Sequence, residues 1–145
     1  MIITLTPTVD TNAYASGDNI GGLITLGSGI LAPSNPLALL RKILVTDAAN
    51  QGANLTALFF DANPSNTTFT DNGALTINSA DIAKLVAAIT ITTHSTFGSV
   101  KLSQSADLAL PLQANASGVL YLALQSNGTP TYTASALTVR LAFDK

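Results

Sequence analysis

One histidine and eight aspartates could carry acid–base chemistry in this sequence, which contains no glutamate and no cysteine. A histidine-based triad or metal site would have to use His94, and the adjacent Ser95 does not stand on the strand-to-helix elbow that presents a hydrolase nucleophile. Asp61, Asp71 and Asp81 could supply a glycosidase pair, but they fall in predicted turns or at a predicted helix start, where aspartate has a structural role. We therefore predict no catalytic residue and no enzymatic activity.

The stretch from Asp61 to Ser65 is similar to the start of an EF-hand calcium loop. Asn66 stands where that loop needs glycine, however, and Asn72 stands where a bidentate glutamate would close the site. An EF-hand is therefore not predicted, while an oxygen-ligand cation site of another geometry in residues 61–72 stays open. Glycine pairs such as Gly21-Gly22 lack the Lys-Ser/Thr ending of a phosphate cradle. These patterns predict no cofactor and no metal ligand.

Aromatic and basic side chains are too sparse to indicate a sugar or nucleic-acid site. Tyr14, Tyr121 and Tyr132 could form a platform for a sugar ring, but the chain has no tryptophan, and packing in a core or interface is favoured. The net charge is −2, and the single adjacent basic pair is Arg41-Lys42, so no electrostatic footprint for nucleic acid is present. The lack of cysteine excludes disulfides, Cys-ligated zinc and thiol catalysis.

Charge is unusually scarce along the whole chain. Charged residues make up 10% of the sequence and hydrophobic residues 47%, whereas a charged share of about 25% is typical. A mean hydropathy of +0.39 suggests that part of the surface is covered by copies of the chain or by a larger assembly. A length of 145 residues predicts one domain spanning residues 1–145.

Neither a leader nor a membrane segment is expected. Residues 1–4 lack a basic region ahead of an apolar core, so we do not interpret them as a secretory signal. No apolar run approaches the roughly 18 residues that a membrane span needs. We expect a soluble, unprocessed chain without a membrane partner.

Hydrophobic periodicity predicts about eight to ten short strands and one short helix. The helix is expected from Asp81 to Val86, behind the N-cap candidate Ser79, and the stretch from His94 to Gly98 is expected to be a loop. Pro7 makes residues 1–9 an edge strand or an arm laid on a neighbour. The strands are predicted at residues 3–9, 20–26, 39–46, 55–60, 89–93, 100–104, 108–112, 119–125 and 137–143.

This spacing of strands and turns is typical of sandwiches and jelly rolls. We predict an all-β fold with one short helix, an antiparallel β-sandwich with jelly-roll topology. Strands 39–46 and 55–60 are expected to pair as a long-looped hairpin.

The sequence resembles the small virion proteins of tailed bacteriophages that are called head decoration or cement proteins. The likeness runs over most of the chain, at the level of pattern and without a catalytic signature. It is carried by Asp10-Thr11-Asn12-Ala13-Tyr14-Ala15-Ser16-Gly17-Asp18 with Gly21-Gly22, by Leu58-Phe59-Phe60-Asp61-Ala62-Asn63-Pro64-Ser65 through Thr68-Phe69-Thr70-Asp71-Asn72, and by Gly128-Thr129-Pro130-Thr131-Tyr132 with Leu137 to Leu141.

The resemblance implies a capsid-stabilising module, often a homotrimer, that sits on the outer surface of the phage head. It would lock neighbouring subunits of the major capsid protein, and it would be made in the host cytoplasm and located in the virion. The alternative is a tail- or fibre-associated adhesion module that binds host-surface glycan. Partner contacts are expected in three segments, at Ile3, Leu5 and Val9, at Ile30, Leu31, Pro33 and Pro36, and at Asn63, Pro64, Asn66 and Phe69.

Overall fold

The computed structural model of the chain describes residues 1–27 and 35–144. Within these residues the chain forms ten strands and one short 3-10 helix. In chain order the elements are β1 (Ile2–Leu5), β2 (Asn19–Leu26), β3 (Leu37–Asp47), β4 (Leu55–Phe60), η1 (Ile82–Lys84), β5 (Leu85–Ile91), β6 (Thr93–Phe97), β7 (Val100–Ser105), β8 (Leu110–Gln113), β9 (Leu120–Ser126) and β10 (Leu137–Asp144).

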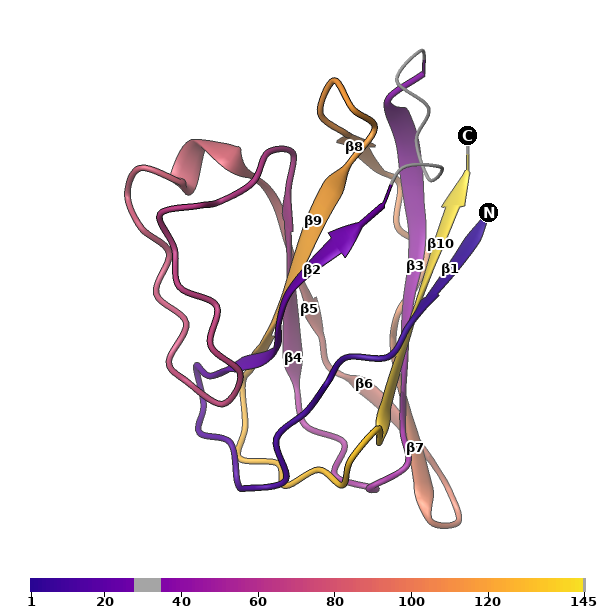
Figure 1. The fold of residues 1–145 in the computed structure, drawn as a ribbon. Coiled ribbons are helices and arrows are strands. Elements are labelled where there is room, and N and C mark those ends of the chain that lie inside the picture. Colours follow the sequence, from indigo (N-terminus) through magenta and orange to yellow (C-terminus); the bar gives the residue numbers. More distant parts are fainter. Residues whose placement is uncertain (28–34, 145) are drawn as a thin grey trace.

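The strands form two antiparallel sheets that face each other (Figure 1). One sheet has the order β1-β10-β3-β7-β6, with β8 also paired to β3, and the other has the order β2-β9-β4-β5. Eight strands pair from the chain ends inward, β1 with β10, β2 with β9, β3 with β8 and β4 with β5. This is the pairing of one long hairpin rolled into two layers, which is the jelly-roll topology. The predicted fold class is confirmed.

The strands β7 and β8 pair with different parts of β3, on the side opposite β10. Residues Ile43–Asp47 of β3 pair with β7, and residues Leu37–Leu40 pair with β8. The remaining strand, β6, pairs with β7 and extends the larger sheet by one strand. The β6–β7 hairpin is therefore an addition to the eight-stranded core, and it projects from one end of the molecule (Figure 1).

The predicted helix is wrong. Only Ile82–Lys84 are helical, in a single 3-10 turn, and Leu85 begins the edge strand β5. The run Leu85–Ile91 gains the backbone hydrogen bonds of a strand by pairing with β4. A helix of the predicted length would form only a few internal hydrogen bonds, which offset little of the conformational entropy lost by ordering its backbone. Tertiary pairing therefore outweighs the local helix signal.

Two other local predictions are also wrong. The stretch from His94 onward is not a loop, because Thr93–Phe97 form β6 and His94 lies opposite Ser103 of β7. The strands β3 and β4 do not form a hairpin, because they belong to different sheets. The chain passes from one sheet to the other between β3 and β4. The carboxylate of Asp47 holds the start of this connection by accepting hydrogen bonds from the backbone N–H groups of Ala49, Gln51 and Gly52, each at 2.8 Å.

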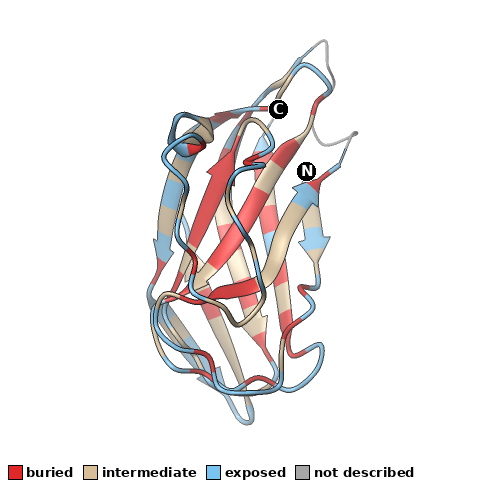
Figure 2. Ribbon diagram, turned by 60° about the vertical axis from the view of Figure 1, so that its left-hand side comes forward, coloured by how far each residue is buried: buried red, intermediate tan, exposed pale blue. Residues whose placement is uncertain are grey.

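The core lies between the sheets, and buried residues are concentrated in the inner strands of both (Figure 2). β10 is the clearest case, because Leu137, Val139, Leu141 and Phe143 are all buried while the residues between them are not. Its predicted alternation is confirmed, as expected for a strand that pairs on both sides and has one face in the core.

A second, smaller cluster lies apart from the sandwich core. Leu58 and Phe60 of β4 and Ala123 of β9 are buried there together with Leu75. Phe69, which precedes Leu75 in the same long connection between β4 and β5, packs against this cluster. That connection therefore folds back onto the smaller sheet.

The structure has no helix, within residues 1–27 and 35–144, that combines the length and apolar character of a membrane span.

Candidate functional site

The first predicted contact segment belongs to the chain's own sandwich. Ile3 and Leu5 are half-buried and pack against the core, and Val9 is only 7% exposed. Residues 2–5 are an edge strand, because β1 pairs with β10 in the larger sheet. Val9 therefore offers a partner little surface. On β1 the accessible apolar side chain is that of Ile2, which is 70% exposed.

The turn from Asn63 to Phe69 also packs mainly on its own chain. Pro64 is buried, and the ring of Phe69 meets that of Phe60 edge-on, with a centroid distance of 6.0 Å and an interplanar angle of 84°. Asn63 and Asn66 are exposed. These two side chains, rather than the apolar ones, form the accessible part of the predicted contact.

Asp81 holds this turn in place. Its carboxylate accepts hydrogen bonds from the Asn66 backbone N–H (2.9 Å) and the Thr67 hydroxyl (2.8 Å), and it pairs with the Lys84 ammonium at 2.8 Å. Burial alone would raise the pKa of Asp81, but the Lys84 ammonium and the hydrogen bonds from Thr67 and Asn66 outweigh it and hold the pKa below its ordinary value. A carboxylate kept ionised in this way is suited to structure and not to general acid catalysis.

Asp71 joins the N-terminal segment to the same long connection. The hydroxyl of Tyr14 donates to Asp71 Oδ1 at 2.7 Å, and the backbone N–H of Gly21 donates to the same oxygen at 2.6 Å. Burial, together with the hydrogen bond to Asp71, raises the pKa of Tyr14. Tyr14 also meets Tyr132 edge-on at 5.7 Å between ring centroids. Because both rings are buried, these two tyrosines leave no open face on which a sugar could stack.

His94 is held between two polar partners. Its Nδ1 lies 2.6 Å from Ser103 Oγ, and its Nε2 lies 2.7 Å from Asn54 Oδ1. Hydrolytic triads combine a nucleophile, a histidine and a third side chain that orients the imidazole, but Ser103 is only 2% exposed, so its hydroxyl is closed to a substrate. The trio instead ties β6 and β7 to the residue that precedes β4, and so links the two sheets.

Cation ligands do not converge in the part of the chain that the structure describes. No group of three or more histidine or aspartate side chains is placed there to hold a metal ion. Within the stretch that was compared with a calcium loop, Asp71 binds Tyr14 and Gly21.

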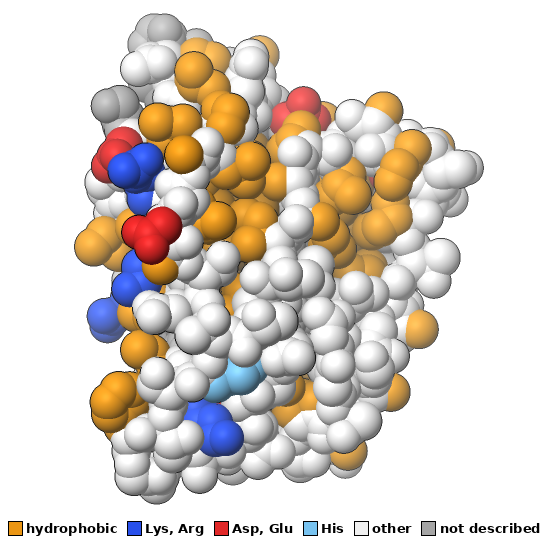
Figure 3. Space-filling model, turned by 180° about the vertical axis from the view of Figure 1, so that it is seen from behind, with side chains coloured by type: hydrophobic (Ala, Val, Ile, Leu, Met, Phe, Trp, Pro, Cys, Tyr) orange, Lys and Arg blue, Asp and Glu red, His pale blue; other side chains and the backbone are white. Residues whose placement is uncertain are grey.

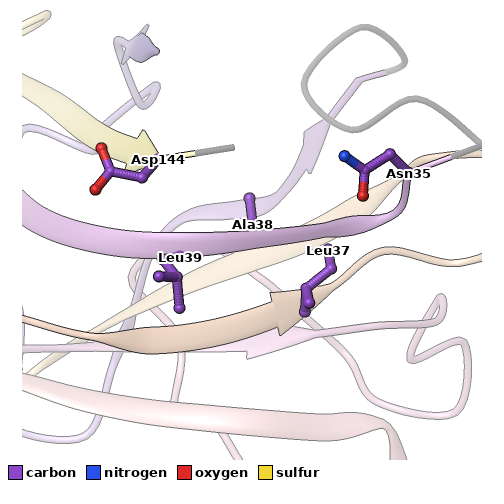
Figure 4. A pocket seen from close by; sticks show the side chains of 5 residues that line it. All are labelled: Asn35, Leu37, Ala38, Leu39 and Asp144. Carbon is purple, nitrogen blue, oxygen red and sulfur yellow. The ribbon is translucent and has the colours of Figure 1, made fainter.

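The remaining predicted contact segment lies largely outside the described residues. Ile30, Leu31 and Pro33 fall there, and Pro36 is half-buried just before β3. A shallow hollow of about 270 Å³ at the start of β3 is lined by Asn35, Leu37, Ala38, Leu39 and Asp144 (Figure 4). Asp144, which lines the hollow, pairs with Arg41 at 3.2 Å.

Apolar side chains are uncovered where β5 and β8 form one side of the sandwich. The half-buried residues Ala87 and Ile89 of the first strand pack against the core, as do Leu108 and Leu110 at the second. We call these four residues the open side. Seen from behind, hydrophobic side chains gather in the upper half of the molecule, while charged side chains lie mainly along one margin (Figure 3).

None of the four open-side residues was among the predicted partner contacts. Strands 89–93 and 108–112 were predicted, but nothing in the sequence indicated that the apolar residues of these strands would be only half-buried. The signal available in the sequence was that the run Leu85–Ile91 is mostly apolar and carries no charge. Comparisons of the chain with protein-family models, with curated proteins and with solved structures gave no match.

Proposed function

We propose that this chain is a structural virion protein, a capsid decoration or cement protein. It binds the outer surface of a tailed-phage head and stabilises the contacts between major capsid subunits. The observation that carries the proposal is the combination of uncovered apolar side chains with a chain in which 10% of residues are charged. The resemblance of residues 10–22, 58–72 and 128–141 to such proteins supports the same function.

The physical demand on a cement protein is a large apolar contact that repeats over the shell. Each Å² of apolar surface removed from water contributes about 25 cal/mol, so contacts of ordinary size repeated by symmetry add up to substantial stabilisation. A two-layered sandwich with a continuous core suits this role because it transmits force without deforming.

Two exposed apolar side chains are the best candidates for anchoring the chain to a shell. Phe97 is 62% exposed and ends β6 in the projecting β6–β7 hairpin, and Ile2 is 70% exposed on β1. Aromatic residues that fill a partner's pocket often dominate the energy of an interface. We infer that Phe97 is the stronger anchor of the two.

The test is binding to shells that lack the protein. Purified chain is mixed with capsids of its own phage from which this protein has been removed, and bound chain is measured by co-sedimentation. Phe97→Ser should weaken binding by at least about tenfold, whereas the neighbouring Thr96→Ser should leave it unchanged. Imaging intact particles by cryo-electron microscopy should locate the chain on the head. A location on the tail, together with binding on a glycan array, would instead favour the adhesion module.

A further inference from the structure

The outer edge of β5 is an unpaired strand edge. β5 pairs with β4 on one side and ends the four-stranded sheet, and no other described strand pairs with it. In an antiparallel sheet, alternate residues direct their backbone N–H and C=O groups to each side. About half of the backbone groups of β5 are therefore directed away from the sheet, where another strand could pair with them.

The side chains of β5 do not guard this edge. From Leu85 to Thr93 the chain has no charged residue, no proline and no glycine. The register shift opposite Phe59 and Phe60 lies near the start of β5, so residues 87–91 pair regularly. Val86, Ala88 and Thr90 are exposed along the strand.

The other strands at sheet edges carry features that discourage pairing. β1 has only four residues, and β2 has a register shift at Gly21 and Gly22. β8 contains Pro111, which lacks a backbone N–H, and β6 is polar except for its last residue. Natural proteins protect exposed edges with short strands, bulges and proline, and β5, with seven residues, lacks all three over residues 87–91.

We propose that β5 of a second copy of this chain pairs antiparallel with this edge, about a two-fold axis. The two four-stranded sheets would then form one continuous sheet across the pair. This inference deepens the proposed function, since it names an interface through which copies of a structural protein hold one another. It predicts a two-fold contact, whereas the resemblance to decoration proteins implies a homotrimer.

The absence of charge supports a second copy as the partner. In an antiparallel pair of identical strands, residues of the same strand face each other, and like charges placed opposite each other are destabilising. β5 has no charges, so two copies meet without repulsion. The nearest charge, that of Lys84, lies just outside the strand and is paired with Asp81 at 2.8 Å. Pairing would also place apolar surface of the partner beside Ala87 and Ile89, the half-buried residues of the open side on this strand.

Cysteine cross-linking can test the pairing directly, because the chain has no cysteine of its own. Single variants Val86→Cys, Ala88→Cys and Thr90→Cys are oxidised alone and in mixed pairs. With the axis at Ala88, Ala88→Cys should cross-link to itself, and Val86→Cys should cross-link to Thr90→Cys, since a disulfide needs Cα atoms about 4.4–6.8 Å apart. If the two strands pair in another antiparallel register, other residues will cross-link, but the two residue numbers of every cross-linked pair must still add to the same total. Thr96→Cys on β6 is the control and should not cross-link.

Association in solution provides the second readout. The native chain should sediment as a dimer, and Ala88→Lys should weaken dimerisation by at least about tenfold. A mixture of Ala88→Lys with Ala88→Glu should restore it, while Thr96→Lys should have no effect. Circular dichroism would establish that each variant folds.

A monomeric native chain, or cross-linking through Thr96→Cys and not through β5, would overturn the proposed pairing. Neither result would contradict the proposed function, which fails only if the protein does not bind capsids.

Discussion

His94 faces Ser103 across the β6–β7 pair, with Nδ1 2.6 Å from the hydroxyl oxygen, and the opposite ring nitrogen reaches Asn54 Oδ1 at 2.7 Å. A single imidazole thus spans the added hairpin and the segment that leads into β4 of the other sheet. The contact explains why the hairpin is fixed to the sandwich at its base while its tip, which begins at Phe97, is exposed.

Replacing His94 with alanine should therefore destabilise the fold. The buried Ser103 hydroxyl would lose its hydrogen-bond partner, at a cost of about 1–3 kcal/mol. Chemical denaturation of His94→Ala, of Asn54→Ala and of the double variant gives a cycle whose coupling energy should be about 0.5–3 kcal/mol. A coupling of zero would mean that the His94–Asn54 contact does not stabilise the native state.

The carboxylate of Asp81 should make stability depend on pH in the acid range. The pKa of this group is lower in the folded protein than its ordinary value of 3.8, so the folded state favours the ionised form. Its contribution is fully present above the ordinary value and is lost as the pH falls toward the lower folded-state value. Asp81→Asn should lower the melting temperature at neutral pH, and the difference from the native chain should shrink in acid.

The matched control for this experiment is Asp144→Asn. Asp144 pairs with Arg41 at 3.2 Å, but both side chains are at least half exposed, and exposed ion pairs contribute about 0–1 kcal/mol. Melting curves measured from neutral to acid pH should separate the two variants. Equal shifts for Asp81→Asn and Asp144→Asn would contradict the structural role of Asp81.

The hydroxyl of Tyr14 should be worth more to stability than that of an ordinary tyrosine. It donates to Asp71 and accepts from the backbone N–H of Asp10 at 2.8 Å, so Tyr14→Phe leaves both groups short of a partner. We expect a loss of about 1–3 kcal/mol in urea denaturation. Tyr121→Phe is the control, since the Tyr121 hydroxyl has no hydrogen bond to any residue that the structure describes.

The local sequence pattern was sufficient to predict a strand and its buried residues where that strand lies inside a sheet and has one face in the core. β10 is such a strand, and its inward residues Leu137, Val139, Leu141 and Phe143 are those that the alternation indicates. The pattern failed for the start of β5, because Ser79, Ala83 and Lys84 give a helix signal that runs into Leu85 and Val86, which pairing with β4 makes extended. A short segment can satisfy both patterns, and only its tertiary partner decides between them.

The candidate site was less accessible to sequence reasoning than the fold. Tyr14 and Asp71 are 57 residues apart, and His94 and Asn54 are 40 apart. The topology brings each pair together, and no local motif indicates either contact. The uncharged run in β5 was visible in the sequence, but its meaning depends on its lying at a sheet edge.

Two glycines with positive φ separate the effect of backbone conformation from that of close packing. Gly21 has a φ of +76°, and an added Cβ would lie 2.6 Å from the Cβ of the buried Pro7, whereas Gly17 has a φ of +99° and open space around it. Gly17→Ala should cost about 1 kcal/mol, mainly from the strained backbone. Gly21→Ala should cost more, because Pro7 must also move and the Gly21 N–H bond to Asp71 is disturbed. Denaturation midpoints that are equal for the two variants would contradict the close approach of Pro7 to β2.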